Sequence, residues 1–178
     1  TRPPGVYRGN PFQVEVGMAY GGALPAEEPA ILYRFANRVP LIYQQSACAI
    51  TKGTIQTAWK NYHISQSRGA LPAAPMLIMV HMASVWVPFT SESKEAIAHY
   101  PEIMKEIKLG LQECGRQLGM FLSRRRRDHD ALMKSSYIEK YIPHIGIALQ
   151  EILGFNDKEK DRVIVTLKNT LERSRTHG

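Results

Sequence analysis

The class of fold expected for this chain follows from one apolar run, Met76-Leu77-Ile78-Met79-Val80-His81-Met82-Ala83-Ser84-Val85-Trp86-Val87. Apolar residues fill both alternating sets of positions in this run, with His81 and Ser84 as the polar exceptions. A strand of that kind is typical of a sheet that helices cover on both faces. The run ends at Pro88, whose ring removes a backbone donor and so stops the ladder of strand hydrogen bonds. We therefore expect a long strand over residues 76–87 in a layered protein.

Shorter segments with strand character precede this run. Residues 12–16 alternate apolar and polar side chains, which indicates a half-buried strand. Residues 31–43 hold two strand-like runs, of which residues 39–43 are the clearer. Ser46 is a candidate N-cap for a helix that continues through Trp59. Strands, a helix, a further strand and then helices predict an α/β or α+β sandwich.

Beyond Pro101 the pattern becomes helical. Apolar residues recur every three or four positions, at Ile103, Ile107, Leu111, Cys114, Leu118 and Leu122. This spacing predicts an amphipathic helix of about 25–35 residues. A small sheet cannot cover so long a helix, so we expect residues 102–134 to project as a stalk. The predicted domains are a core over residues 1–101, this stalk, and a helical tail over residues 135–178 made of two shorter helices divided at residues 154–157.

Composition limits the class of protein. The 178 residues carry a net charge of +7 and are 44% hydrophobic, as expected of a globular domain with a sizeable core. No apolar run approaches about 20 residues, so no membrane contact is expected. Cys48 and Cys114 lack metal-ligand spacing, which favours reduced core thiols in a cytoplasmic protein and no metal site. Because the chain begins at Thr1 and not at a methionine, we expect it to be part of a longer protein.

Lys94 is the first candidate functional residue. It follows the hydroxyl-rich residues 90–93, at a position where a helix is expected to begin. A lysine is a flexible point charge, and a helix start supplies unpaired backbone N–H groups, so both would favour a phosphate. The alternative is a solvated surface lysine, which is the commoner role of an isolated lysine.

Trp59-Lys60-Asn61-Tyr62 is the second candidate site. Nucleic-acid surfaces combine cations for phosphates with flat side chains for sugars or bases. The alternative, favoured by the frequent burial of Trp, is that Trp59 closes the end of a helix while Lys60 is solvated. A further basic run, Arg124-Arg125-Arg126-Arg127, surrounds the long helix, so it is either solvated or a docking element.

The sequence contains no recognisable self-contained active site. It has no glycine-rich phosphate loop ending in Lys-Ser or Lys-Thr, no Gly-x-Gly-x-x-Gly after a strand, no Gly-x-Ser-x-Gly and no His-Glu-x-x-His. His81, inside the long strand, is expected to be a hydrogen-bonded core residue and not a catalyst. Any chemistry that involves this chain is therefore expected to be completed by other domains or chains.

Four segments resemble, in order and spacing, the transducer domain of the topoisomerase VI B subunit. They are Arg8-Gly9-Asn10-Pro11-Phe12-Gln13-Val14-Glu15-Val16-Gly17 with Ala19-Tyr20-Gly21-Gly22, then Arg34-Phe35-Ala36-Asn37-Arg38-Val39-Pro40-Leu41-Ile42-Tyr43, then Trp59-Lys60-Asn61-Tyr62, and Val87-Pro88-Phe89-Thr90-Ser91-Glu92-Ser93-Lys94-Glu95-Ala96-Ile97. The resemblance covers about two-thirds of the chain, roughly to Arg127, and is loose in the tail.

The resemblance implies a transducer in the ATPase subunit of a type IIB topoisomerase, an enzyme that passes one DNA duplex through a break in another. It implies a mixed sheet with a left-handed β-α-β crossover, against the usual right-handed preference. Lys94 occupies the position of the family's lysine that reaches the γ-phosphate of ATP and couples hydrolysis to rotation of the transducer. Trp59, Lys60 and Tyr62 occupy the W-K-x-Y positions, which in the family help to bind or bend DNA.

The family's catalytic parts are not expected in this chain. The GHKL-class ATPase domain and the helix–two-turn–helix insert have no counterpart here, and the family's A subunit carries the DNA-cleaving tyrosine. ATP and Mg²⁺ are expected to bind mainly outside this chain, which we expect to be inactive alone and to hold no cofactor.

The implied partners are the A subunit, near the tail, a second copy of the B subunit when ATP is bound (an A2B2 heterotetramer), and double-stranded DNA. The residues leave open two alternatives: a DNA- or partner-binding module with no link to ATP, and a scaffold that only joins an ATPase head to the A subunit.

Overall fold

The computed structural model describes residues 1–154 and 156–176. Its contacts divide the chain into two units, Thr1–Leu122 and Ser123–Gly178. The strands, all in the first unit, are β1 (Gly5–Tyr7), β2 (Asn10–Tyr20), β3 (Ile31–Ala36), β4 (Val39–Pro40), β5 (Ser65–Gln66), β6 (Pro72–Ala73) and β7 (Met76–Ser84). The helices are the 3-10 helices η1 (Gln45–Ala47) and η2 (Trp59–Tyr62), and the α-helices α1 (Ala49–Gln56), α2 (Pro101–Leu153) and α3 (Asp157–Thr176).

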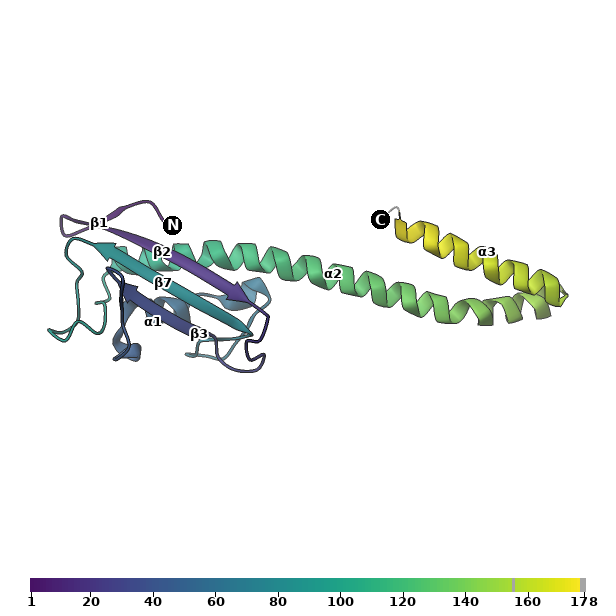
Figure 1. Ribbon diagram of the computed structural model, residues 1–178, viewed down its shortest axis with the longest axis horizontal. Coiled ribbons are helices and arrows are strands. Elements are labelled where there is room, and N and C mark those ends of the chain that lie inside the picture. The colour runs from purple at the N-terminus through teal and green to yellow at the C-terminus, as the bar shows by residue number, and fades with distance from the viewer. Residues whose placement is uncertain (155, 177–178) are drawn as a thin grey trace. The chain divides into compact units, whose positions relative to one another are not determined.

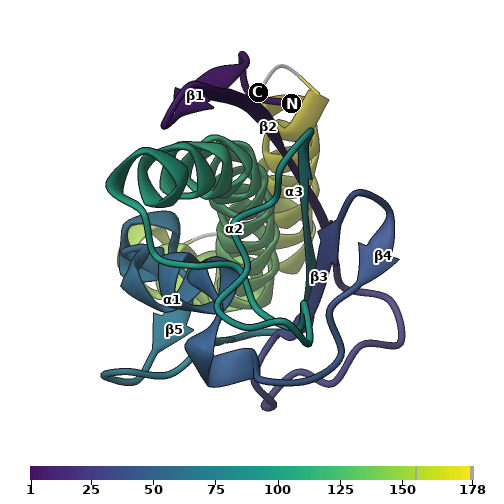
Figure 2. The same ribbon diagram turned by 90° about the vertical axis from the view of Figure 1, so that its left-hand side faces the viewer.

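Five of the strands form a mixed sheet in the order β1-β2-β7-β3-β4. β7 pairs antiparallel with β2 and parallel with β3. In Figure 1, β3 and β7 both run from right to left, β7 lies above β3, and α1 of their connection lies behind the sheet. Figure 2, turned by 90°, shows α1 and α2 on that same side of the sheet. A connection arranged in this way is left-handed, so the expected mixed sheet with its uncommon crossover is confirmed.

One face of the sheet is covered in the described part of the chain. Along β7, Met76, Ile78, Val80 and Met82 are buried, whereas Met79 is 42% exposed. The expected strand over residues 76–87, covered on both faces, is therefore wrong. β7 ends at Ser84, and β2 is longer, with 11 residues against 9. The apolar pattern could not reveal this, because it does not show which of two apolar faces the helices cover.

The end of β7 is set by the side chain of Asn37, in the turn between β3 and β4. Its Nδ2 donates to the Ser84 carbonyl at 2.8 Å, and its Oδ1 accepts from the Ser84 N–H at 2.9 Å. These two bonds satisfy the backbone groups that a longer strand partner would otherwise use. Asn37 and Arg38 have φ values of 47° and 71°, the left-handed region that a tight two-residue hairpin turn requires.

Two other local expectations are corrected. β4 comprises only Val39–Pro40, so residues 39–43 do not form the clearer strand, and β3 is the longer of the two. The helix expected from Ser46 through Trp59 is divided into η1, α1 and η2. It breaks after Gln56 because Thr57 adopts an extended backbone with ψ of 131°.

The first turns of α2 fill the centre of the core. Ile103, Ile107 and Leu111 are fully buried, as their spacing predicts. A Cβ added to Gly53 of α1 would lie 2.7 Å from the Cγ2 atom of Ile107. The two helices therefore approach as closely as a glycine permits.

α2 is longer than expected, since it runs without interruption over 53 residues and includes Pro143. The separate helix expected from residue 135 is therefore its continuation. α3 begins where the break was expected, at a capping box in which Asn156 Oδ1 accepts from the Glu159 N–H at 3.0 Å and Glu159 Oε2 accepts from the Asn156 N–H at 2.9 Å. Division of the chain at residues 101 and 134 stays a prediction. Among the described residues, no helix combines the length and hydropathy needed to cross a bilayer.

We predict that Ile107→Ala lowers the free energy of unfolding by about 2–5 kcal/mol, because it leaves a cavity between α1 and α2. Met79→Ala, on the uncovered face of β7, is the control and should change stability by less than about 1 kcal/mol. Urea denaturation of both variants measures the difference. Equal losses would contradict the placement of the core.

Candidate functional site

Lys94 lies on a loop that joins β7 to α2. At the base of this loop, the Thr90 N–H donates to the Ala96 carbonyl at 2.9 Å and the Ala98 N–H donates to the Pro88 carbonyl at 2.8 Å. No helix begins at Lys94, whose φ is 56°, and the helix that follows is α2. The expected helix start at this position is therefore wrong, and no helix dipole contributes to binding there.

The base of the Lys94 loop is buried and its tip is exposed. Ala96 and Ile97 have no exposed surface, and the Ile97 carbonyl accepts from the Ala49 N–H of α1 at 2.8 Å. Residues 91–94 are exposed and closed into a tight turn by the bond from the Lys94 N–H to the Ser91 carbonyl at 3.2 Å. The loop thus holds one flexible cation on a short turn above a fixed base.

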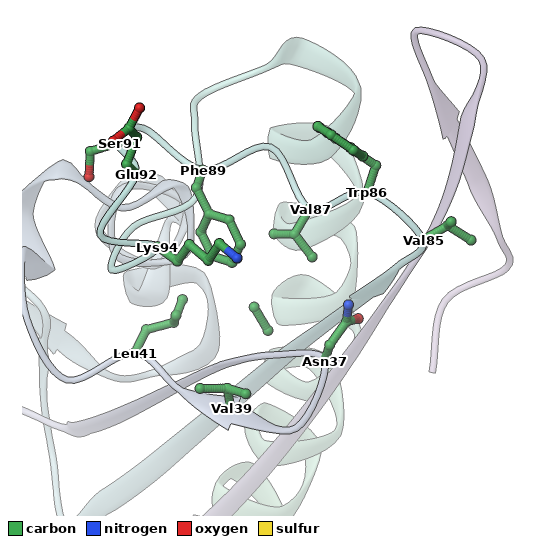
Figure 3. A pocket seen from close by; sticks show the side chains of 11 residues that line it. Asn37, Val39, Leu41, Val85, Trp86, Val87, Phe89, Ser91, Glu92 and Lys94 are labelled. Carbon is green, nitrogen blue, oxygen red and sulfur yellow. The ribbon is translucent and has the colours of Figure 1, made fainter.

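A hollow of about 560 Å³ lies beside Lys94. Figure 3 shows the Lys94 amine extending into it beside Phe89, with Ser91 and Glu92 at its rim. Its walls are mainly apolar and include Val39, Leu41, Val85, Trp86 and Val87. Val85 and Trp86 are 85% and 71% exposed. An apolar surface with a single lysine at its centre is suited to contact another folded part of a protein and an anion that it carries.

Aromatic contacts fix the end of the loop that leads into α2. The ring of Tyr100 lies 4.0 Å from that of Tyr7, measured between centroids, and the Arg8 guanidinium lies 5.2 Å from the Tyr100 centroid. Burial, together with the neighbouring Tyr100 hydroxyl, raises the pKa of Tyr7 to about 12. Tyr7 therefore stays neutral and acts as a packing residue at the start of α2.

His81 holds the turn between β3 and β4, which borders the hollow. Its Nε2 accepts from the Arg38 N–H at 3.2 Å, so its Nδ1 carries the proton that is donated to Glu15 Oε2 at 2.9 Å. This hydrogen bond lowers the pKa of Glu15. His81 is hydrogen-bonded as expected, but its side chain is 23% exposed on the uncovered face of the sheet, so it is not a core residue.

The role of Arg34 was not apparent from the sequence. Its side chain is 4% exposed, and its Nη2 donates to the Tyr43 carbonyl at 3.1 Å. The bond fixes the segment that follows Leu41, one wall of the hollow. A lone arginine in the middle of an apolar strand was the signal that could have indicated this role, because a buried guanidinium needs a specific acceptor.

Trp59 and Tyr62 of η2 pack inward. Trp59 is fully buried, and its indole N–H donates to the Thr54 carbonyl at 2.8 Å. The Tyr62 ring lies over two glycines of α2, and a Cβ added to Gly115 would be 2.7 Å from it. Lys60 is exposed. The structure thus brings the aromatic residues together as a support and leaves Lys60 able to meet a ligand. Whether the segment binds DNA stays a prediction.

Metal binding has no geometric support in the part of the chain that the structure describes. Across these residues, no three His, Cys, Asp or Glu side chains gather closely enough to hold an ion. Cys48 is buried and Cys114 is half-buried, and both are free thiols. Burial raises the pKa of Cys114, so its thiol is protonated and unreactive near neutral pH.

A family model for the topoisomerase VI B subunit transducer matches residues 1–134. The chain belongs to this family. Among curated relatives, the B subunit of type 2 DNA topoisomerase 6 from Archaeoglobus fulgidus is 45% identical over 96% of this chain and 28% of its own length. The protein of the same name from Methanosarcina mazei is 43% identical over the same shares. The chain therefore spans little more than a quarter of the length of these relatives.

The alignment with the Archaeoglobus protein covers 171 residues, so the relationship extends into the tail, where the sequence suggested only a loose resemblance. A solved DNA gyrase B protein from Myxococcus xanthus aligns with 65% of this chain and 36% of its own at 22% identity, with a TM-score of 0.42. That likeness is too distant to inform the fold or the function.

We predict an energetic coupling between Gly115 and Tyr62. In the natural chain, Gly115→Ala drives a methyl group into the Tyr62 ring, an overpacking that costs about 1–3 kcal/mol. In a Tyr62→Ala background the clash is gone, and the same change should stabilise the protein by up to about 1 kcal/mol through helix propensity. Urea denaturation of the four proteins in this double-mutant cycle gives the coupling energy. Identical effects of Gly115→Ala in both backgrounds would contradict the packing of η2 on α2.

Proposed function

We propose that this chain is the transducer of a topoisomerase VI B subunit, in which it couples ATP binding and hydrolysis to DNA cleavage and strand passage by the A subunit. One observation carries the proposal: Lys94 stands on an exposed turn whose base is hydrogen-bonded to α1 and leads directly into α2. Because the chain belongs to the topoisomerase VI B subunit family, we propose that the anion that Lys94 meets belongs to ATP.

The interaction energy of a lysine–phosphate contact is large enough to drive a conformational switch. Two opposite unit charges 4 Å apart interact by about 4 kcal/mol at an effective dielectric constant of about 20. Reversing an equilibrium from 1:99 to 99:1 takes about 5.5 kcal/mol. Lys94 on the γ-phosphate would therefore supply much of the bias toward the ATP-bound arrangement. Hydrolysis separates that phosphate and so removes the bias.

The base of the loop provides the route from Lys94 to the stalk. The Ile97 carbonyl accepts a hydrogen bond from α1. Three residues later, the ring of Tyr100 packs on Tyr7, and its backbone carbonyl accepts from the Met104 N–H in the first turn of α2 at 2.9 Å. Few residues between the Lys94 turn and the start of α2 are therefore without such a contact. A displacement of the Lys94 turn would therefore move the start of α2 instead of being absorbed within the loop.

ATP and Mg²⁺ are proposed to bind mainly in parts of the protein outside this chain, with Lys94 as the contribution of this chain to the site. Bound ATP supplies the anhydride whose hydrolysis releases the γ-phosphate. The chain alone is proposed to be inactive in both ATP hydrolysis and DNA cleavage. Its proposed partners are the A subunit, a second B subunit in an A2B2 assembly, and double-stranded DNA. The free thiols of Cys48 and Cys114 fit the reducing cytoplasm.

Lys60 is proposed to contact a DNA phosphate, with Trp59 and Tyr62 holding η2 in place. Lys60 is exposed, whereas the two aromatic residues pack against α1 and α2. A module that binds DNA without any link to ATP is the second candidate, and it rests on this same exposed lysine. Under that alternative, Lys60→Ala impairs DNA binding while Lys94→Ala has no effect on the enzyme.

We predict that Lys94→Ala, in the complete heterotetrameric enzyme, lowers the rate of ATP-dependent DNA relaxation at least about tenfold, the effect of losing about 1.4 kcal/mol of coupling. Glu92→Ala, on the same exposed turn, is the matched control and should relax DNA at nearly the natural rate. A supercoiled-plasmid relaxation assay with and without ATP compares them. Natural rates for the Lys94→Ala enzyme would refute the proposed role.

A further inference from the structure

One turn of α2 in the second unit is dominated by arginine. Residues 123–130 contain Arg124, Arg125, Arg126 and Arg127, all exposed, and no apolar side chain. The proposed coupling of Lys94 to ATP makes no use of this segment. The segment therefore needs its own explanation.

Helix geometry divides the basic residues between two sides of α2. Arg124, Arg127, Ala131 and Lys134 follow the spacing i, i+3, i+7 and i+10, which places them on one side of a helix. We call this set the basic side of α2. It extends about 15 Å along the axis from Arg124 to Lys134, and the small Ala131 leaves the backbone accessible. At about 100° per residue, Arg126 lies about 160° around the axis from Arg124 and about 100° from Arg127, so it stands outside this set.

The charges of the basic side are not neutralised within the described residues. Asp128 follows Arg124 by four positions and Asp130 follows Arg127 by three, so helix geometry offers a partner to each arginine. In both cases the acid is C-terminal to the base, which is the weaker order on a helix. In the described part of the chain, no ion pair forms at Arg124, Arg127 or Lys134. Three cations thus remain available on one side.

We propose that the basic side of α2 binds the phosphate backbone of double-stranded DNA. Arginine forks match phosphate oxygens in pairs, and about 15 Å of duplex presents roughly four phosphates on one strand. A protein partner fits less well, because the centre of a protein interface is depleted of charge and this segment has no apolar side chain around which to form one. The large exposed apolar residues of α2 lie outside residues 123–130: Met120 and Phe121 precede the segment, and Leu132, Met133, Tyr137, Ile138 and Tyr141 follow it.

Contact with phosphates alone makes the binding independent of DNA sequence and sensitive to salt. Each phosphate that a cation neutralises steepens the plot of log affinity against log salt by about 0.9. Arg124 and Arg127 together would therefore contribute about 1.8 to that slope. The inference rests on the proposed function only in that the complete enzyme acts on DNA.

The test is DNA binding by the complete heterotetrameric enzyme, without ATP. Fluorescence anisotropy of a labelled linear duplex gives the affinity between about 50 and 200 mM KCl, a range in which phosphate contacts change affinity strongly. The double variant Arg124→Gln with Arg127→Gln is expected to reduce the slope by about 1.8. Gln has nearly the helix propensity of Arg, so the helix is retained.

Two matched variants keep the test decisive. Arg126→Gln, outside the basic side of α2, should leave the slope unchanged, and Arg124→Lys with Arg127→Lys should preserve it. An unchanged slope in the double Gln variant overturns the proposal. An equal fall of the slope in Arg126→Gln also overturns it, because the effect would then not be specific to the basic side.

Weaker assembly of the double Gln variant with the DNA-cleaving subunit, at an unchanged slope, also overturns the proposal and indicates an acidic protein partner. Failure here is separable from failure of the proposed function. The Lys94→Ala enzyme reports on ATP-driven relaxation, whereas the salt slope reports only on phosphate contacts in α2.

Discussion

The hydrogen bond from the Ala49 N–H to the Ile97 carbonyl joins α1, the Lys94 loop and the segment before α2 at one buried point. Around it, Gly53 lets α1 lie directly against Ile107 of α2. A longer side chain at either contact would separate the helices and release the loop. The exposed lysine is therefore held by fully buried core residues, which lets a force at the loop reach the helix.

The division between a fixed base and an exposed tip accounts for the sensor role that we propose for Lys94. A lysine at positive φ carries backbone strain, which persists where the surrounding structure imposes it. Here the two backbone bonds between residues 88–90 and 96–98 impose that turn. The basic side of α2 differs, since its arginines stand on a regular helix in the other unit and need no strained support. The two proposed phosphate contacts thus differ in their support: a strained turn holds Lys94 for ATP, and a regular helix presents the arginines to DNA.

Much of the fold and part of the site could be predicted from the sequence. The apolar spacing of Ile103, Ile107 and Leu111 identified α2, and four motif segments identified the family and its mixed sheet. Two features could not be predicted. The one-sided burial of β7 depends on which face the helices cover, and the turn at Lys94 depends on the backbone hydrogen bonds that close the base of its loop. For Trp59 the residue pattern favoured burial whereas the family resemblance implied a role at DNA, and an amphipathic aromatic side chain fits both.

The most direct test of the proposed coupling is backbone hydrogen exchange in the full-length B subunit, measured at the amides of Thr90, Lys94 and Ala98. These amides close the Lys94 turn and its base. A non-hydrolysable ATP analogue should slow their exchange in the natural protein and leave it unchanged in Lys94→Ala. No change in the natural protein, or equal slowing in the variant, would contradict the account.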